Sequence, residues 1–222
     1  MNITILGAGT WGIALAEVLD YNGCKVSIWH YDNEYIANLQ KSRFNKKLNS
    51  KVSPKINFIS SEDEINKSSI ILICLPSQSI RNVLVSLKLK NKYYINASKG
   101  IELESGKLIS QIIDETTLGT HNTIACISGP SHAEELIKKI PTVISVASEN
   151  PDFSKAIQKI FSNKFLRLYE SDSINAMQVG GAVKNIISIA AGICAGLGYG
   201  DNTIAALITR GIQEIIRFSD LY

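Results

Sequence analysis

The sequence predicts an α/β fold with a parallel sheet, followed by a second domain made only of helices. Short β-branched runs alternate with amphipathic stretches up to about residue 168, an alternation typical of βαβ units. The run Ile70-Ile71-Leu72-Ile73-Cys74 is continuously apolar, as expected of a central strand covered on both faces. After Tyr169 the strand patterns stop, and from Asp172 onward the chain has the pattern of a helix.

These patterns divide the chain into an expected first domain, residues 1–169, and a helical second domain, residues 170–222. Strands are expected at Asn2–Leu6, Lys25–Trp29, Ile56–Ile59, Ile70–Cys74, Tyr93–Ala97, Ile124–Ile127 and Thr142–Ala147. Helices are expected between them at Thr10–Asn22, Asn33–Lys41, Ser79–Leu87, Lys107–Glu115, Ser131–Lys139 and Asp152–Phe161. The polar segment Phe44–Lys55 is expected to be a surface connection.

Composition excludes several classes of protein. Of the 222 residues 45% are hydrophobic and 19% charged, so the chain is too apolar to be disordered and long enough to bury a core. The net charge is only +3 and the basic residues are scattered, so no nucleic-acid partner is expected. Only five of the 23 basic residues are Arg, which makes bidentate phosphate contacts scarce.

The cysteine and histidine positions argue against both disulfides and a metal. Each of the four cysteines lies inside an apolar run, so buried, reduced thiols are expected (Cys24, Cys74, Cys126, Cys194). The three histidines lack metal-ligand spacing, so no metal site is expected. Reduced thiols and an N-terminus without a signal-peptide pattern predict a cytoplasmic protein.

The uncharged segment Asn185–Gly200 raises the question of a membrane span. It is shorter than the ~18 residues usually needed, and Lys184 and Asp201 bracket it. The spacing Gly192-x-x-x-Gly196-x-x-x-Gly200 matches a membrane dimer motif. A buried, tightly packed helix is nevertheless the expectation, with no membrane span.

The loop Gly7-Ala8-Gly9-Thr10-Trp11-Gly12 lies between the first predicted strand and a helical pattern. Gly7 permits a tight turn, Gly9 lets the backbone approach a pyrophosphate, and Gly12 lets the helix pack against the strand. Free N–H groups at the start of the helix can bind the phosphates. A plain glycine turn is the alternative, but the flanking elements favour a Rossmann-like dinucleotide-binding domain.

The end of the second predicted strand reads Trp29-His30-Tyr31-Asp32 and does not identify the dinucleotide. An NAD site usually has Asp or Glu here to accept from the ribose 2′-hydroxyl. His30 stands at the tip instead, and Asp32 is placed to cap the next helix. With neither a clear acid nor an Arg, the preference between NADH and NADPH stays open.

Three further motifs follow predicted strands, whose carboxyl ends line the ligand crevice of an open α/β sheet. Leu75-Pro76-Ser77-Gln78 is explained equally well as a turn and helix start. In Asn96-Ala97-Ser98-Lys99-Gly100, Lys99 either points into the crevice or is a surface lysine. The third motif is Ser128-Gly129-Pro130-Ser131-His132-Ala133-Glu134. Its Ser131 and Glu134 have capping-box spacing, so Ser131 is expected to cap a helix, and a ligand-binding role is also open.

The motif Gly180-Gly181-Ala182-Val183-Lys184-Asn185 places one lysine in the nearly charge-free stretch Ser173–Gly200. Burying Lys184 requires a lowered pKa or a partner, and such a lysine can act as a general acid/base near neutral pH. A structural lysine whose ammonium reaches solvent is the alternative.

Together these motifs resemble, in order, those of bacterial NAD(P)-dependent glycerol-3-phosphate dehydrogenases. The matching pieces are Gly7–Gly12, Leu75-Pro76-Ser77, Ser98-Lys99-Gly100, Gly129-Pro130-Ser131-His132-Ala133-Glu134, Gly180–Asn185, Gly196–Asn202 and Thr209-Arg210-Gly211. The resemblance implies interconversion of dihydroxyacetone phosphate and sn-glycerol 3-phosphate by hydride transfer with NAD(P)H, supplying glycerophospholipid synthesis. It is also compatible with a homodimer.

The resemblance also assigns roles to individual residues. Lys184 would be the catalytic acid/base on the C2 oxygen, with Asn185 beside it, and Lys99 would meet both nicotinamide and substrate. Gly129 and Ser131 would face substrate. The cofactor would be met by Gly7, Gly9, Thr10, Trp11, Gly12, His30, Tyr31 and Ala133, although Tyr31 departs from the basic or His residue often found there.

The chemistry of the residues agrees with these roles. Reduction of a ketone needs a proton donor at the carbonyl oxygen and a positive charge near the developing alkoxide. Lys184 can donate the proton and Lys99 can supply the charge. Two ammonium groups in one crevice would also lower each other's pKa.

One departure from the family concerns the second domain. In the family, the helical domain continues to a Gly-Asp motif that helps hold the catalytic Lys and a Ser-Arg-Asn motif that grips substrate phosphate. No counterpart follows Thr209-Arg210-Gly211 here, so the all-α domain is expected to be incomplete, a C-terminal truncation. A catalytically inactive dinucleotide-binding fragment is therefore an alternative. A β-hydroxyacid dehydrogenase relative is another, against which the Gly-Pro-Ser-x-Ala-Glu stretch argues.

Overall fold

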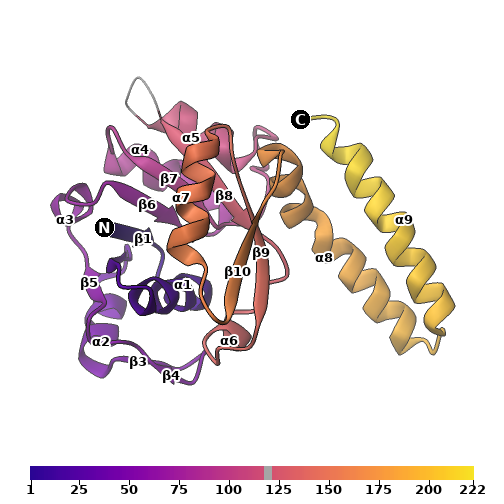
Figure 1. Ribbon diagram of the computed structural model, residues 1–222, viewed down its shortest axis with the longest axis horizontal. Coiled ribbons are helices and arrows are strands. Elements are labelled where there is room, and N and C mark those ends of the chain that lie inside the picture. Colours follow the sequence, from indigo (N-terminus) through magenta and orange to yellow (C-terminus); the bar gives the residue numbers. More distant parts are fainter. Residues whose placement is uncertain (118–121) are drawn as a thin grey trace.

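The computed structural model describes residues 1–117 and 122–222. Among these residues, eight strands form one sheet in the order β10-β9-β8-β7-β6-β1-β2-β5 (Figure 1). The strands are β1 (Asn2–Leu6), β2 (Lys25–Trp29), β5 (Asn57–Ile59), β6 (Ile70–Ile73), β7 (Tyr93–Asn96), β8 (Thr123–Ser128), β9 (Thr142–Ser148) and β10 (Leu166–Glu170). The predicted α/β fold is confirmed.

The sheet is mainly parallel, as predicted, and one pair of strands departs from this. β9 is antiparallel to β8 and parallel to β10, whereas the other neighbours in the sheet are parallel. A parallel partner requires a crossover that returns to the opposite edge of the sheet. The segment from Gly129 to Pro141 instead stays at the edge where β8 ends, with only the short helix α6 (Ala133–Leu136). The whole connection therefore stays at the carboxyl edge of the sheet, where Gly129 and Ser131 directly follow β8.

Two further strand features were not predicted. β10 alternates buried Leu166 and Leu168 with exposed polar residues, the pattern of an edge strand. The segment expected to be a surface connection contains a small antiparallel hairpin, β3 (Phe44–Asn45) and β4 (Ser50–Lys51). The other predicted strands match the structure to within one residue at each end.

Helices cover both faces of the sheet. One face carries α1 (Thr10–Tyr21), α2 (Asn33–Ser42) and α7 (Pro151–Phe161), and the other carries α3 (Glu62–Asn66), α4 (Ile80–Leu87) and α5 (Ile109–Thr116). The central strand β6 alternates between the two layers: Ile70 and Leu72 join the first cluster, Ile71 and Ile73 the second. This two-sided burial is why β6 is apolar throughout.

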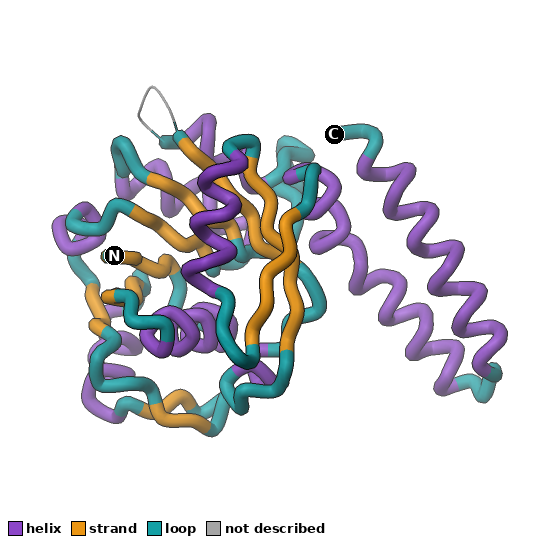
Figure 2. The backbone as a smooth tube through the Cα atoms, viewed as in Figure 1, coloured by secondary structure: helices purple, strands orange, loops and turns teal. Residues whose placement is uncertain are grey.

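The C-terminal region forms two helices, α8 (Ile174–Gly196) and α9 (Asp201–Ser219), rather than the single helical stretch that was expected. The chain turns at residues 197–200, where Gly198 has a φ of +80°, a conformation that side chains other than glycine adopt rarely. The helices lie antiparallel, and the pair extends away from the sheet (Figures 1 and 2). The domain boundary near residues 169–170 stays a prediction.

The expectation that α8 is buried is wrong. Its buried residues are Gln178, Val179 and Gly181, near the sheet, whereas Ile189 is 65% exposed. In the described part of the chain, beyond its docking on β8 and β9, α8 packs mainly on α9, which leaves its other side open. By length and composition alone α8 is the one described helix that could cross a membrane, a test that core helices of globular proteins also pass.

The cysteine prediction is correct only in part. All four thiols are free, but only Cys126 is buried, and the others are half-buried. Burial raises the pKa of the Cys126 thiol to about 12, so that this thiol stays protonated at neutral pH. Among the described residues, no group of three His, Cys, Asp or Glu side chains is arranged to hold a metal ion.

The contact between α8 and α9 gives a test of this packing. A Cβ at Gly211 would lie 2.6–2.9 Å from side-chain atoms of Ile187, whereas a Cβ at Gly192 would meet nothing within 4 Å. Gly211→Ala should therefore lower the free energy of unfolding by ~1–3 kcal/mol through overpacking. Gly192→Ala, the matched control, should leave it unchanged or raise it by up to ~1 kcal/mol. Urea titration of both variants checks this, and equal effects would contradict the packing described.

Candidate functional site

A cavity of about 460 Å³ lies at the carboxyl ends of β1, β6, β7 and β8. Four of the motifs singled out in the sequence contribute to it, from segments as far apart as residues 9 and 134. Its lining residues are Gly9, Thr10, Trp11, Gly12, Cys74, Leu75, Pro76, Ala97, Ser98, Lys99, Ser131, His132, Ala133 and Glu134. This is the crevice that the sheet topology predicts for a ligand.

The glycine-rich loop forms one wall of this cavity. Gly7 has a φ of +113°, and a Cβ there would collide with the carbonyl oxygen of Cys74. A Cβ at Gly12 would collide with the carbonyl oxygen of Gly7, whereas Gly9 has open space beside it. α1 begins after Gly9 with no side-chain cap and no acid in its first turn. Its first N–H groups are therefore available to an anion.

The end of β2 lies beside the glycine loop, because the Gly7 N–H donates to the Trp29 carbonyl at 2.9 Å. Asp32 caps α2, accepting from the Tyr35 N–H at 2.9 Å, as the sequence suggested. His30 stacks on Tyr31, with ring centroids 4.5 Å apart, and burial lowers the pKa of His30. His30 and Tyr31 lie outside the residues that line the cavity.

Lys99 reaches the turn after β8. Its Nζ donates to Ser131 Oγ at 3.1 Å, and Ser131 Oγ donates to the Gly129 carbonyl at 3.1 Å. Burial is the main cause that lowers the pKa of Lys99 from 10.5 to about 8, and the neighbouring Lys184 ammonium adds to it. The predicted alternative of a surface lysine is therefore excluded.

The prediction that Ser131 caps a helix is wrong. α6 begins only at Ala133, and the residue at its N-cap, His132, makes no side-chain cap hydrogen bond. Gly129 has a φ of +154°, and the turn it makes directs the Ser131 hydroxyl back toward the Gly129 carbonyl and Lys99. Ser131 thus belongs to the crevice rather than to the helix.

Lys184 comes to the same turn from α8. Its Nζ donates to the Gly129 carbonyl at 3.3 Å. The helix approaches β8 closely because Gly181 has no side chain: a Cβ there would lie 2.6 Å from Ser128 Oγ. Asn185, the next residue, is exposed on the surface of α8 and is not brought into this group.

No Arg side chain contributes to the crevice within the described residues. Arg43 donates to backbone carbonyls, Arg81 pairs with Glu102 and Glu115, and Arg167 lies over the ring of Tyr169. The remaining two, Arg210 and Arg217, pair with Glu214 on α9. Lys99 is among the residues that line the cavity, whereas Lys184 and Gly129 are not. Lys184 places its positive charge beside the cavity, at the turn that Lys99 also contacts.

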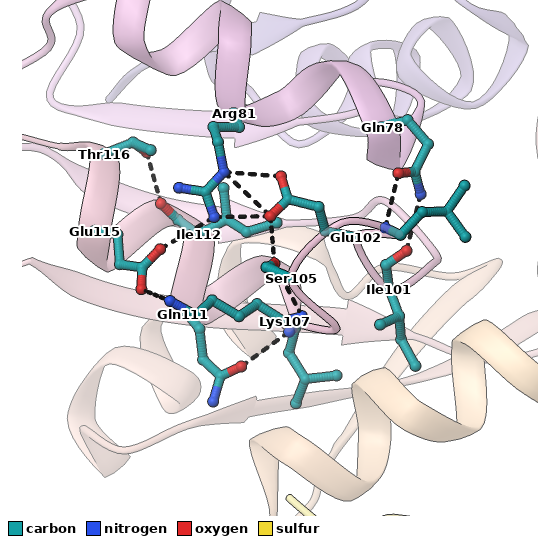
Figure 3. A network of polar contacts seen from close by, with 12 residues as sticks. Gln78, Arg81, Ile101, Glu102, Ser105, Lys107, Gln111, Ile112, Glu115 and Thr116 are labelled. Atoms are coloured by element: carbon teal, nitrogen blue, oxygen red, sulfur yellow. Dashed lines mark hydrogen bonds and ion pairs between the residues drawn. The ribbon is translucent and has the colours of Figure 1, made fainter.

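Sequence reasoning missed Arg81 and Glu102, which hold the Lys99 segment, and gave Gln78 no role there. Gln78, Arg81 and Glu102 form a polar network around it (Figure 3). The pairing of Arg81 with Glu102 joins positions 21 residues apart on different elements, and no local pattern in the sequence indicates it.

Two family models match the chain. The model described as NAD-dependent glycerol-3-phosphate dehydrogenase N-terminus covers residues 2–154, and the model for the C-terminus of the same enzymes covers residues 173–222. The chain belongs to this family.

Bacterial members of the family are similar to this protein over almost its whole chain. Glycerol-3-phosphate dehydrogenase (NAD(P)+) from Fusobacterium nucleatum is 40% identical over 97% of this chain and 66% of its own length. The protein of that name from Prosthecochloris aestuarii is also 40% identical, over 99% of this chain and 68% of its own length. The chain thus spans about two thirds of the length of these relatives.

Solved structures agree. Glycerol-3-phosphate dehydrogenase from Coxiella burnetii superposes with a TM-score of 0.91 at 33% identity, covering 99% of this chain and 69% of that one. The dehydrogenase from Saccharomyces cerevisiae gives a TM-score of 0.88 at 22% identity, over 100% of this chain and 70% of that one, which shows the shared fold.

The close approach of α8 to β8 gives a test of how Lys184 is placed. Gly181→Ala should push α8 away from Ser128, lower the free energy of unfolding by ~1–3 kcal/mol and disturb the contact of Lys184 with Gly129. Gly180→Ala is the matched control, because its Cβ would meet nothing within 4 Å. Thermal and urea unfolding provide the measurement.

A second substitution sharpens this comparison. Ser128→Ala removes the hydroxyl that the new methyl group would strike, so the double variant Gly181→Ala/Ser128→Ala should recover part of the loss. Purely additive effects would show that Ser128 does not set the position of α8.

Proposed function

We propose that this chain binds NAD(P)H in the crevice and carries the site at which dihydroxyacetone phosphate and sn-glycerol 3-phosphate are interconverted. The observation that supports this most strongly is the convergence of two ammonium groups, from Lys99 and Lys184, on the turn Gly129–Ser131 beside the glycine loop. A reducible ketone bearing a phosphate needs this kind of positive, proton-donating site.

The residues of the crevice fit a dinucleotide. The uncapped start of α1 and the open side of Gly9 suit a pyrophosphate, and Thr10, Trp11 and Ala133 would lie along the cofactor. When bound, the nicotinamide supplies or accepts the hydride. His30 and Tyr31 offer neither a carboxylate for a 2′-hydroxyl nor a guanidinium for a 2′-phosphate, so the proposal covers NADH and NADPH alike.

The two lysines have different roles in the proposed reaction. Lys184 donates a proton to the C2 oxygen of the ketone, and the Gly129 carbonyl orients its ammonium group. Lys99, with a pKa of about 8, is protonated at neutral pH and stabilises the negative charge that develops on that oxygen. Ser131 holds Lys99 in place. Both Gly129 and Ser131 would face the substrate.

The substrate class also suggests a role. Glycerol 3-phosphate is the backbone of glycerophospholipids, so the supply of this precursor is the role we propose for the reaction.

A second candidate is nucleotide binding without turnover. It is favoured by one observation: in the described part of the chain no Arg side chain faces the crevice, so the substrate phosphate would be met by lysines alone. Each missing charge-assisted hydrogen bond weakens binding by ~1.5–3 kcal/mol.

Substitution of Lys184 tests the catalytic assignment. Lys184→Ala should slow NAD(P)H oxidation by dihydroxyacetone phosphate by at least ~100-fold, because the proton donor is lost. Nucleotide affinity, followed by tryptophan fluorescence, should change little. Lys138→Ala, which removes an exposed lysine that does not line the cavity, is the control.

The outcomes separate the candidates. Turnover that survives in Lys184→Ala contradicts the catalytic role. Nucleotide binding with no oxidation by the unaltered chain favours the second candidate, and failure to bind either nucleotide rules out both.

The lowered pKa of Lys99 predicts a pH dependence. Lys99 carries its charge below pH 8 and loses it as the pH rises through about 8, so affinity for the anion sn-glycerol 3-phosphate should fall by ~10-fold between pH ~7 and pH ~9.5. Lys99→Arg keeps a charge throughout this range and should lose that dependence. Calorimetric titration measures it, and an equal pH dependence in both proteins would contradict the assignment.

A further inference from the structure

The segment that carries Lys99, residues 98–108, connects β7 to α5 and is fixed on both sides of the lysine; we call it the Lys99 loop. Before Lys99, Ser98 Oγ donates to the Leu75 carbonyl at 2.7 Å, and the Ser98 N–H donates to Asn96 Oδ1 at 2.9 Å. After it, Gly100 has a φ of +136° and packs so closely on Ser77 that a Cβ would lie 2.5 Å from the hydroxyl. Lys99 thus starts from a restrained backbone.

Two side chains from the α4 side hold the next part of the loop. Gln78 donates from Nε2 to the Ile101 carbonyl at 2.8 Å and accepts from the Leu103 N–H at 3.0 Å, bridging the backbone on both sides of Glu102 (Figure 3). Arg81 binds the Glu102 carboxylate through Nε and Nη2, each at 2.8 Å, in a bidentate pair. These contacts tie the Lys99 loop to α4.

The ion pair belongs to a larger network. The Ser105 hydroxyl also donates to Glu102, while Glu115 on α5 accepts from Arg81 and from Lys107 (Figure 3). The Glu102 side chain is only 10% exposed, and its hydrogen bonds to Arg81 and Ser105 lower its pKa to about 2. Glu102 is therefore ionised throughout the range in which Lys99 titrates.

The direction in which Glu102 points matters for Lys99, three residues away. A carboxylate facing an ammonium group would stabilise its charge. The groups that meet Lys99 are instead Ser131 and Lys184, and the Glu102 carboxylate is bound to Arg81 and Ser105. The loop thus presents the lysine to the crevice and the acid to α4.

We propose that Arg81 and Glu102 are positioning residues, whose ion pair fixes the Lys99 loop so that the Lys99 ammonium lies against Ser131 and beside Lys184. This inference rests on the proposed function for its importance in the reaction, but its geometry concerns Lys99 alone. Isolated surface ion pairs contribute little to stability. The pair of Arg81 and Glu102 is bidentate, belongs to a network and covers all but 10% of the Glu102 side chain, with Arg81 31% exposed. Such a pair serves instead to hold one arrangement of the loop.

The test measures the titration of Lys99 in Glu102→Gln and Arg81→Gln. Lysines are labelled by reductive methylation with ¹³C, and the Lys99 resonance is assigned with Lys99→Arg. In the unaltered protein Lys99 should titrate near 8. In either variant its pKa should rise by ~1 unit or more toward 10.5, because the loop no longer holds the ammonium in its half-buried place beside Lys184.

Two controls separate positioning from general destabilisation. Glu214→Gln breaks an equivalent pair with Arg210 and Arg217 on the exposed surface of α9 and should leave the titration of Lys99 unchanged. Arg81→Lys keeps the charge but not the bidentate geometry, so it should fold and give a smaller shift than Arg81→Gln. If Glu102→Gln does not fold, the comparison of Arg81→Lys with Arg81→Gln still tests the proposal.

The proposal is overturned if the folded variants titrate Lys99 within ~0.3 unit of the unaltered protein, whatever their melting temperatures. NAD(P)H titration of the unaltered protein is a separate arm. If no nucleotide binds but the Lys99 shift occurs, the proposed function fails and the positioning role stands. If nucleotide binds and the shift is absent, the positioning role fails, and nucleotide binding by the crevice stands.

Discussion

Two ammonium groups that share one turn of backbone are the constraint on which the site depends. Lys99 binds the Ser131 hydroxyl and Lys184 binds the Gly129 carbonyl, so like charges lie close together in a half-buried crevice. The two ammonium groups repel each other, and this repulsion adds to burial, the larger cause, in lowering the pKa of Lys99. The two ammonium groups stay close together because both lysines extend from restrained parts of the backbone. An anionic phosphate and a developing alkoxide between them would reduce the repulsion, which makes the arrangement useful for the reaction.

The fold supplies these restraints in three places. The turn Gly129–Ser131 directly follows β8 and therefore lies at the carboxyl edge of the sheet. Gly181 lets α8 approach β8 so that Lys184 reaches that turn. The network around Arg81 and Glu102 holds the Lys99 loop against α4 and α5. The sheet, α8 and the Lys99 loop therefore all contribute to the position of the two ammonium groups.

Much of this was accessible from the sequence, because it depends on local patterns. The strands, the glycine loop and the Asp32 cap follow from periodicity, spacing and glycine geometry. The direction of β9 and the role of Ser131 do not follow from such local patterns. For Ser131, the turn at Gly129 overrides the capping-box spacing with Glu134. The exposure of α8 was also missed, because an apolar sequence does not reveal how many neighbours cover it. The Arg81–Glu102 pair depends on tertiary contact alone.

The most direct test of the central claim observes the two lysines while ligand is added. With ¹³C-methylated lysines, addition of sn-glycerol 3-phosphate in the presence of oxidised nucleotide should move the resonances of Lys99 and Lys184 together and raise the pKa of Lys99, because the phosphate anion stabilises its charge. Lysines outside the crevice should not move. If other lysines respond and these two do not, the shared turn is not the substrate site.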